Sequence, residues 1–270
     1  MNLRIAISPC PNDTFIFEHL YLHPQMGEHL LNFEFEDIET LNFKAQHQEA
    51  DIVKISYAQY FDVANDYQLL ESGSALGFGV GPLLVKRNPD AEIPLQDLKV
   101  AIPGIHTTAH FLLRFAFPEI IHKMVMPFHQ IEDAVLNGTC DAGLLIHENR
   151  FTFAQKGLHL IKDLGQYWEE KTHLPIPLGG IAIKRSLPDE LKMQVEDAIR
   201  NSIENAHLRS EPITPFIASH AQEMDPEVMK KHIQLYVNDY SLQIGEKGKA
   251  GILAMQKILA PHFKQSIFIH

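Results

Sequence analysis

Two similar stretches, Gly81-Pro82-Leu83-Leu84-Val85-Lys86-Arg87 and Gly180-Ile181-Ala182-Ile183-Lys184-Arg185, decide how this chain folds. Each is a short apolar run typical of a buried strand, and each ends in Lys-Arg. We interpret them as the paired crossings between two lobes. The first lobe is then split between both ends of the chain, as residues 1–85 plus 184–270, and residues 86–183 form the second lobe.

Strands and helices alternate on both sides of the first stretch. Before it, the pattern predicts strands at 3–7, 31–35 and 51–56, and helices at 15–21, 39–49 and 57–64. Between the two stretches it predicts strands at 99–103 and 141–147, and helices at 109–117 and 131–136. Later helices are expected at 189–207, 214–222, 226–238 and 248–259. This alternation predicts mostly parallel sheets with helix-covered faces, and therefore a two-lobed α/β protein with a cleft between the lobes.

The composition is that of an ordinary soluble globular protein. Among 270 residues, 45% are hydrophobic and 21% are charged, so disorder is excluded. The 23 Lys and Arg against 34 Asp and Glu give a net charge of −11, which argues against a nucleic-acid partner because phosphate contacts need clustered cations. No apolar run approaches the roughly 18 residues of a membrane-spanning helix. A small anionic ligand remains compatible with these numbers, because it responds to local donors.

The start of the chain and its cysteines favour a cytoplasmic location. The apolar run at residues 3–7 is short, and Ser8-Pro9 breaks it before it reaches the length of a secretory signal. Cys10 and Cys140 are the only cysteines, so no disulfide framework is expected.

Four segments are expected to line the cleft. In open α/β sheets, ligands bind beyond the carboxyl ends of the strands. Residues 8–14 and 104–108 are predicted strand-to-helix loops, while residues 54–56 and 146–147 are predicted strand ends. Two of these segments belong to each lobe, so one cleft would receive all four.

Two of the loops end in residues that favour helix starts. These residues are Asn12, Asp13 and Thr14 in the first loop and Thr107 and Thr108 in the second. Free backbone N–H groups at a helix start, together with the helix dipole, suit a carboxylate or phosphate. The alternative is that these residues only cap their own helices, and the two roles are compatible.

His147 is the candidate catalytic base. It ends an apolar strand at the predicted cleft, where an imidazole with a pKa near 6.5 can accept a proton at neutral pH. The alternative is a structural role, since the chain has 16 histidines. Lys54 and Ser56 are placed to orient an anionic ligand, although a lysine at a strand end is commonly just solvated.

Competing motifs are weaker. His106 and His110 are spaced like two metal ligands on one helix face, but His106 precedes the predicted helix and no third ligand is evident. The chain lacks both the glycine-rich dinucleotide motif after its first strand and the phosphate-loop motif. No metal and no nucleotide cofactor is therefore expected.

The opening motif is specific to one family. Ser8-Pro9-Cys10-Pro11-Asn12-Asp13-Thr14-Phe15-Ile16-Phe17 closely resembles the first motif of the 1,4-dihydroxy-6-naphthoate synthases, from the futalosine route to menaquinone. Further similar blocks lie at 37–42, 54–57, 77–82, 103–109, 146–152, 168–170, 174–179, 236–238 and 241–242. The resemblance covers nearly the whole chain, from residue 8 to about residue 245.

The resemblance implies a fold, a reaction and a set of site residues. The fold is the two-lobed periplasmic-binding-protein-like type II fold, with mixed sheets flanked by helices and a cleft between the lobes. The reaction is that of a lyase, which converts cyclic dehypoxanthine futalosine to 1,4-dihydroxy-6-naphthoate and releases dihydroxyacetone without a metal or organic cofactor. The family's catalytic base matches His147. Its substrate-binding residues match Lys54, Ile55, Ser56, Thr107 and Thr108.

Two other classes of protein share this architecture. A non-catalytic binding protein for a small aromatic carboxylate would be expected to carry an export signal or lipid anchor, and neither is visible. The effector-sensing half of a transcription regulator would need a helix-turn-helix before the first strand, which begins at Leu3. The expected partner is therefore a small anionic aromatic substrate, with no nucleic acid and no membrane. The oligomeric state stays open.

Overall fold

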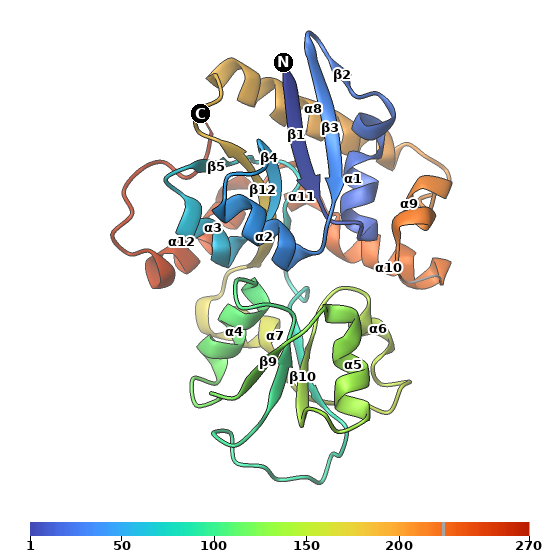
Figure 1. Cartoon of the computed structure of the whole chain (residues 1–270), viewed down its shortest axis with the longest axis vertical. Helices are drawn as coiled ribbons and strands as arrows, with labels where there is room; N and C mark the ends of the chain where they lie inside the picture. Colours follow the sequence, from blue (N-terminus) through green and yellow to red (C-terminus); the bar gives the residue numbers. More distant parts are fainter. Residues whose placement is uncertain (223–224, 270) are drawn as a thin grey trace.

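The chain forms two lobes, each built on its own sheet (Figure 1). The structure is a computed structural model that describes residues 1–222 and 225–269. Both ends of the chain lie in the lobe at the top of Figure 1, and the middle of the chain forms the other lobe. The predicted two-lobed α/β fold is therefore confirmed.

The first lobe contains a seven-stranded mixed sheet. Its strands run in the order β2-β3-β1-β4-β12-β5, and β6 pairs with β12. The bounds are β1 Asn2–Ile7, β2 Gln25–Met26, β3 His29–Phe35, β4 Ile52–Ser56, β5 Tyr67–Leu69, β6 Ala75–Gly77 and β12 Ile176–Lys184. β1 runs parallel to β3 and β4, whereas β12 runs antiparallel to β4, β5 and β6.

Helices cover both faces of this sheet. They are α1 Pro11–Leu22, α2 Ile38–Gln46, α3 Tyr57–Val63, α8 Asp189–His207, α9 Pro215–His220, α10 Pro226–Tyr236, α11 Asp239–Leu242 and α12 Gly245–Leu259. Side chains alternate along β1, so Leu3, Ile5 and Ile7 pack into the core formed with α1 and α8. Ala6, on the opposite face, packs into the core formed with α2 and α3.

The second lobe contains a five-stranded mixed sheet in the order β11-β7-β10-β8-β9. The strands are β7 Leu83–Lys86, β8 Val100–Ile102, β9 Lys123–Val125, β10 Ala142–Leu145 and β11 His159–Asp163. The helices are α4 Thr108–Ala116, α5 Phe128–Leu136, α6 Asn149–Thr152 and α7 Leu164–Thr172. β10, β8 and β9 run parallel to one another, and β7 runs antiparallel to both β10 and β11.

The crossings differ from the prediction in their position. β7 pairs only within the second sheet and β12 only within the first, so neither strand spans the lobes. The predicted division at 85 and 183 therefore places most of each strand in the wrong sheet. The chain passes between the lobes in the short segments 78–82 and 173–175, which contain no strand. Because β7 and β12 run antiparallel to their neighbours, the sheets are mixed, as the family resemblance implied, and not mostly parallel, as the alternation alone predicted.

The two crossings are packed tightly against α7. A Cβ on Gly81 would come within 2.2 Å of the Gly165 Cα, so only glycine fits this approach. Trp168 is fully buried and donates its indole N–H to the Pro175 oxygen at 3.3 Å. The Gly79 N–H donates to Glu169 Oε1 at 2.7 Å. These contacts fix the backbone that connects the lobes.

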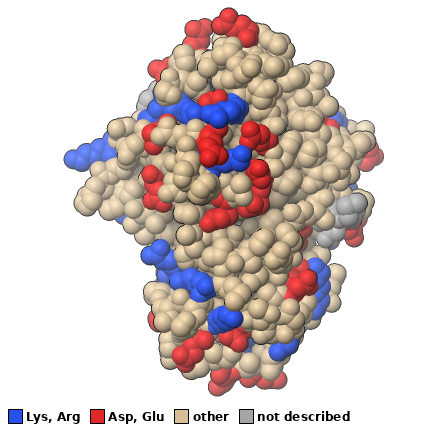
Figure 2. Space-filling model, in the orientation of Figure 1, with Lys and Arg blue, Asp and Glu red and all other residues tan. Residues whose placement is uncertain are grey.

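The surface charge and the lengths of the helices bear on the partners that the protein could have. On the face seen in Figure 2, acidic and basic side chains are intermixed, and no extended basic patch is visible there. Within residues 1–222 and 225–269, no helix has both the length and the apolar character needed to cross a membrane.

Candidate functional site

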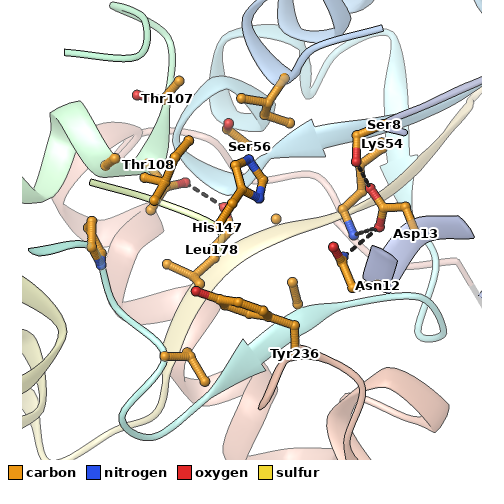
Figure 3. Close-up of a pocket in the computed structure, with 17 residues that line it drawn as sticks. Ser8, Asn12, Asp13, Lys54, Ser56, Thr107, Thr108, His147, Leu178 and Tyr236 are labelled. Carbon is orange, nitrogen blue, oxygen red and sulfur yellow. Dashed lines mark hydrogen bonds and ion pairs between the residues drawn. The ribbon is translucent and has the colours of Figure 1, made fainter. Parts of the chain in front are cut away.

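A cavity lies between the lobes, and all four predicted segments reach it (Figure 3). It holds about 660 Å³ of empty space, including its solvent-open mouth. Residues 54–56 form the carboxyl end of β4, and the other three segments follow the carboxyl ends of β1, β8 and β10; β1 is parallel to β4, and β8 is parallel to β10. Apolar side chains supply most of the remaining wall, including Ile38, Val80, Leu178 and Tyr236.

Most predicted site residues line this cavity. They are Asn12, Asp13, Lys54, Ser56, Thr107, Thr108 and His147. Ile55 does not line it, because side chains alternate along β4 and Ile55 packs into the core on the opposite face from Lys54 and Ser56. Thr14 does not line it either, because its hydroxyl is buried and donates to the Cys10 oxygen at 3.1 Å.

Helix α1 starts earlier than predicted. Cys10 is its N-cap and Pro11 occupies the first helical position, which its fixed φ angle suits. Asn12, Asp13 and Thr14 therefore lie in the first turn and do not act as caps. This places Asn12 and Asp13 at the cavity, where Ser8 Oγ donates to Asp13 Oδ2 at 2.6 Å.

Lys54 is neutralised by Asp13. Its Nζ lies 2.7 Å from Asp13 Oδ1, and both side chains are almost fully buried. Nζ also donates to the Gly73 oxygen at 3.2 Å. A buried pair of opposite charges adds no net charge to the cavity wall, so Lys54 is not a free cation waiting for an anionic ligand.

Ser56 retains a hydroxyl proton for a ligand. Asn42 fixes this residue, because its Nδ2 donates to Ser56 Oγ at 3.1 Å and its Oδ1 accepts the Ser56 N–H at 2.9 Å. Ser56 Oγ thus acts as an acceptor toward Asn42. Its own proton can point into the cavity.

The two threonines at α4 act through their backbone. Thr107 Oγ1 donates to the Gly104 oxygen at 2.9 Å and caps the helix by accepting from the His110 N–H at 3.2 Å. Thr108 Oγ1 donates to the Leu178 oxygen at 2.7 Å, across the cleft. Both hydroxyl protons are used, so the donors that α4 offers are the N–H groups of Thr108 and Ala109, which have no intrahelical acceptor.

His147 lies at the centre of the site. It follows β10 in the left-handed region, with a φ of 55°, and its ring is partly buried. The ring centroid is 4.7 Å from that of Phe128 and 5.9 Å from that of His232, to which it is nearly parallel. In Figure 3, Thr107 and Thr108 lie to one side of this ring, and Asn12, Asp13 and Lys54 lie to the other.

The surroundings keep His147 neutral. Burial lowers its pKa to about 4, against the opposing effect of the Asp13 carboxylate, which raises it. Near neutral pH the imidazole is therefore unprotonated and can accept a proton. An anionic ligand beside it would raise the pKa, because negative charge stabilises the imidazolium.

His232 was missed by the sequence analysis. It lies on α10, is fully buried and bonds through Nε2 to Asn12 Oδ1 at 2.9 Å. Burial lowers its pKa well below the ordinary value. The only signal in the sequence was the apolar face of the predicted helix 226–238, which does not show that this helix packs against residue 12.

The competing features do not assemble a site. His106 Nδ1 bonds to Glu39 Oε1 at 2.8 Å and His110 Nδ1 bonds to the Ile105 oxygen at 2.8 Å, so these rings serve separate partners. Burial and the nearby Glu148 raise the pKa of the Cys10 thiol well above its usual value. Cys10 is therefore a poor nucleophile.

Two mixed-sheet lobes, two short crossings and a ligand cavity between them define a binding-protein-like α/β protein. The comparison with solved structures agrees. A protein from Archaeoglobus fulgidus has a TM-score of 0.87 at 34% identity, covering 95% of this chain and 97% of that one. A Candida albicans protein described as having the generic periplasmic binding protein fold has a TM-score of 0.70 at 14% identity, covering 98% and 92%.

The sequence comparisons show the family. A family model described as menaquinone biosynthesis matches residues 3–261, so the chain belongs to this family. It is 44% identical to a 1,4-dihydroxy-6-naphthoate synthase of Streptomyces coelicolor, over 93% of this chain and 90% of the relative. It is 42% identical to a synthase of the same name from Thermus thermophilus, over 93% and 91%.

Proposed function

We propose that this protein is a carbon–carbon lyase of menaquinone biosynthesis that forms 1,4-dihydroxy-6-naphthoate from cyclic dehypoxanthine futalosine. Dihydroxyacetone would be the fragment released. The observation that carries the proposal is a neutral His147 in a mostly apolar cavity between two lobes, in a chain related to two proteins named for this product. A cytoplasmic location remains part of the proposal.

The substrate carboxylate is assigned to uncharged donors. Lys54 is neutralised by Asp13, so the available donors are the Ser56 hydroxyl and the first N–H groups of α4. The helix dipole adds to the attraction at the start of α4. The apolar wall formed by Ile38, Val80 and Leu178 suits an aromatic ring.

His147 is the proposed general base. It removes a proton from the substrate, the electron pair that remains drives carbon–carbon cleavage, and aromatisation of the product supplies much of the driving force. A positioned base contributes roughly 10²–10⁴ in rate. Donors aimed at developing oxyanion charge contribute further. The proposed reaction requires no redox step.

Incubation with cyclic dehypoxanthine futalosine tests the proposal. Formation of the naphthoate is followed by absorbance and mass. We expect product with the native protein, and a loss of about 10²–10⁴ in kcat for His147→Asn with substrate binding retained. His129→Asn changes an exposed histidine and serves as the matched control. Near-native turnover by His147→Asn would refute the role of His147.

A binding protein for a small aromatic carboxylate is the second candidate. The fold it shares with the Candida albicans protein favours this alternative. Binding of the naphthoate or its precursor without turnover, by protein that calorimetry shows to be folded, would establish it and overturn the lyase.

A further inference from the structure

Three metal-ligating side chains meet beside the proposed base. His147, Glu148 and His232 each place one ligand atom within 4.8 Å of the other two. His147 and Glu148 follow β10 in the second lobe, whereas His232 lies on α10 in the first. The cluster therefore exists only where the lobes meet.

The hydrogen bonds around Asn12 fix the proton on His232. Asn12 Nδ2 donates to Asp13 Oδ1 at 2.9 Å, so the amide oxygen faces the other way, toward His232 Nε2 at 2.9 Å. Turning the amide over would bring its oxygen against the Asp13 carboxylate. Neutral His232 therefore carries its proton on Nε2, and its Nδ1 presents a lone pair.

This lone pair faces another acceptor. Nδ1 of the fully buried His232 has no hydrogen-bond partner among the described residues. It lies 3.6 Å from Glu148 Oε2. A lone pair and a carboxylate oxygen that face each other away from water repel, unless a proton or a cation lies between them.

We propose that His147, Glu148 and His232 form a binding site for one Zn²⁺, and that the bound ion reversibly blocks the reaction. Two imidazole nitrogens and one carboxylate oxygen form a donor set that binds Zn²⁺ in preference to Mg²⁺. An ion roughly 2.1 Å from each donor holds the donors roughly 3.4 Å apart, so shifts of about 1 Å complete the site.

Asn12 and Asp13 act behind the ligands. Their hydrogen bonds orient the His232 ring and fix its tautomer, as partners behind metal-bound histidines do. The ion can enter from the cavity, because His147 lines it. Once bound, Zn²⁺ occupies a lone pair of the imidazole that must accept the substrate proton. Inhibition thus rests on the proposed function, whereas binding does not.

Calorimetric titration of chelator-treated protein with zinc sulfate, without substrate, tests the binding. We expect one tight site per chain, no comparable binding of magnesium, and an affinity about 10–100-fold weaker in Asn12→Ala. His129→Gln, which removes an exposed histidine, should bind as the native protein does. Because variants in this buried cluster can fail to fold, X-ray absorption of the native zinc complex gives a second readout, with two imidazoles and one carboxylate expected.

The activity measurement separates the two proposals. If the protein forms the naphthoate, zinc at one equivalent should abolish turnover and a chelator should restore it. If the protein binds zinc as expected but shows no turnover, the zinc site is supported and the proposed lyase activity is contradicted. Turnover by a protein that binds no zinc would overturn the proposed zinc site, and so would zinc coordination by other residues. In either case a proton, and not a metal ion, lies between His232 Nδ1 and Glu148 Oε2.

Discussion

At the scale of single residues, the site depends on side chains whose charge is set by their surroundings. His147 is neutral because burial opposes its charge, and Lys54 is neutral in effect because Asp13 lies against it. The sequence suggested both residues as site components. It could not reveal that Lys54 is paired, because no local pattern brings residue 13 to residue 54.

The pH profile of kcat/KM should report the environment of His147. Its pKa of about 4 in the folded protein lies below the value near 6.5 of an ordinary histidine. We expect kcat/KM to be flat from neutral pH to about pH 5 and to fall near pH 4, where the free enzyme's base becomes protonated. A fall centred near pH 6.5 would contradict the buried, neutral base.

Folding must be monitored in the same experiment. A histidine whose pKa is depressed in the folded state binds fewer protons there than in the unfolded chain. Its contribution to stability is therefore complete above the unfolded pKa near 6.5, and is lost as the pH falls through the folded value of about 4. Circular dichroism at each pH separates loss of the base from loss of the fold.

At the scale of elements, the strongly patterned segments were predicted well. The helix at 189–207 has the predicted bounds, and the strand expected at 3–7 is β1, Asn2–Ile7. Short strands such as β9 and β11 were missed, because three to five residues carry too little periodicity. The crossings were misplaced for another reason, since an apolar run identifies a buried strand and does not say to which sheet it belongs.

Gly81 should be indispensable to the first crossing. In Gly81→Ala, the new Cβ would lie within 2.2 Å of the Gly165 Cα and 2.4 Å of its nitrogen, so two backbone segments would have to separate. We expect a loss of about 3 kcal/mol or more in the free energy of unfolding, measured in urea, on the scale of severe overpacking. The matched change Gly157→Ala meets no atom within 4 Å and strains only its positive φ of 83°, at a cost of about 1–2 kcal/mol. Equal losses in the two variants would show that the contact with Gly165 is unimportant.

At the scale of the whole molecule, the cavity exists because two lobes are held together across it. Glu39 on α2 accepts from the Ile105 N–H at 3.0 Å and from His106 Nδ1 at 2.8 Å, both in the loop that leads into α4. Thr108 adds a bond from α4 to Leu178 on β12. These contacts hold the start of α4 at the cavity that Ser56 also lines. The four segments at one cleft could be predicted from the sequence, whereas no local pattern indicates that the Glu39 carboxylate connects the lobes.

Glu39→Ala should therefore weaken closure while leaving each lobe folded. The change removes charge-assisted bonds to the second lobe, each of which contributes about 1.5–3 kcal/mol. Fewer molecules would then be in the closed conformation. Because the apparent affinity for substrate falls with the fraction of closed molecules, we expect KM to rise about tenfold or more. X-ray scattering should also show a larger radius of gyration without ligand. Glu49→Ala, an exposed carboxylate just beyond the end of α2, controls for the loss of charge alone. An unchanged KM and radius of gyration in Glu39→Ala would show that the crossings and the Thr108 bond suffice to hold the lobes, and that Glu39 only shapes its loop.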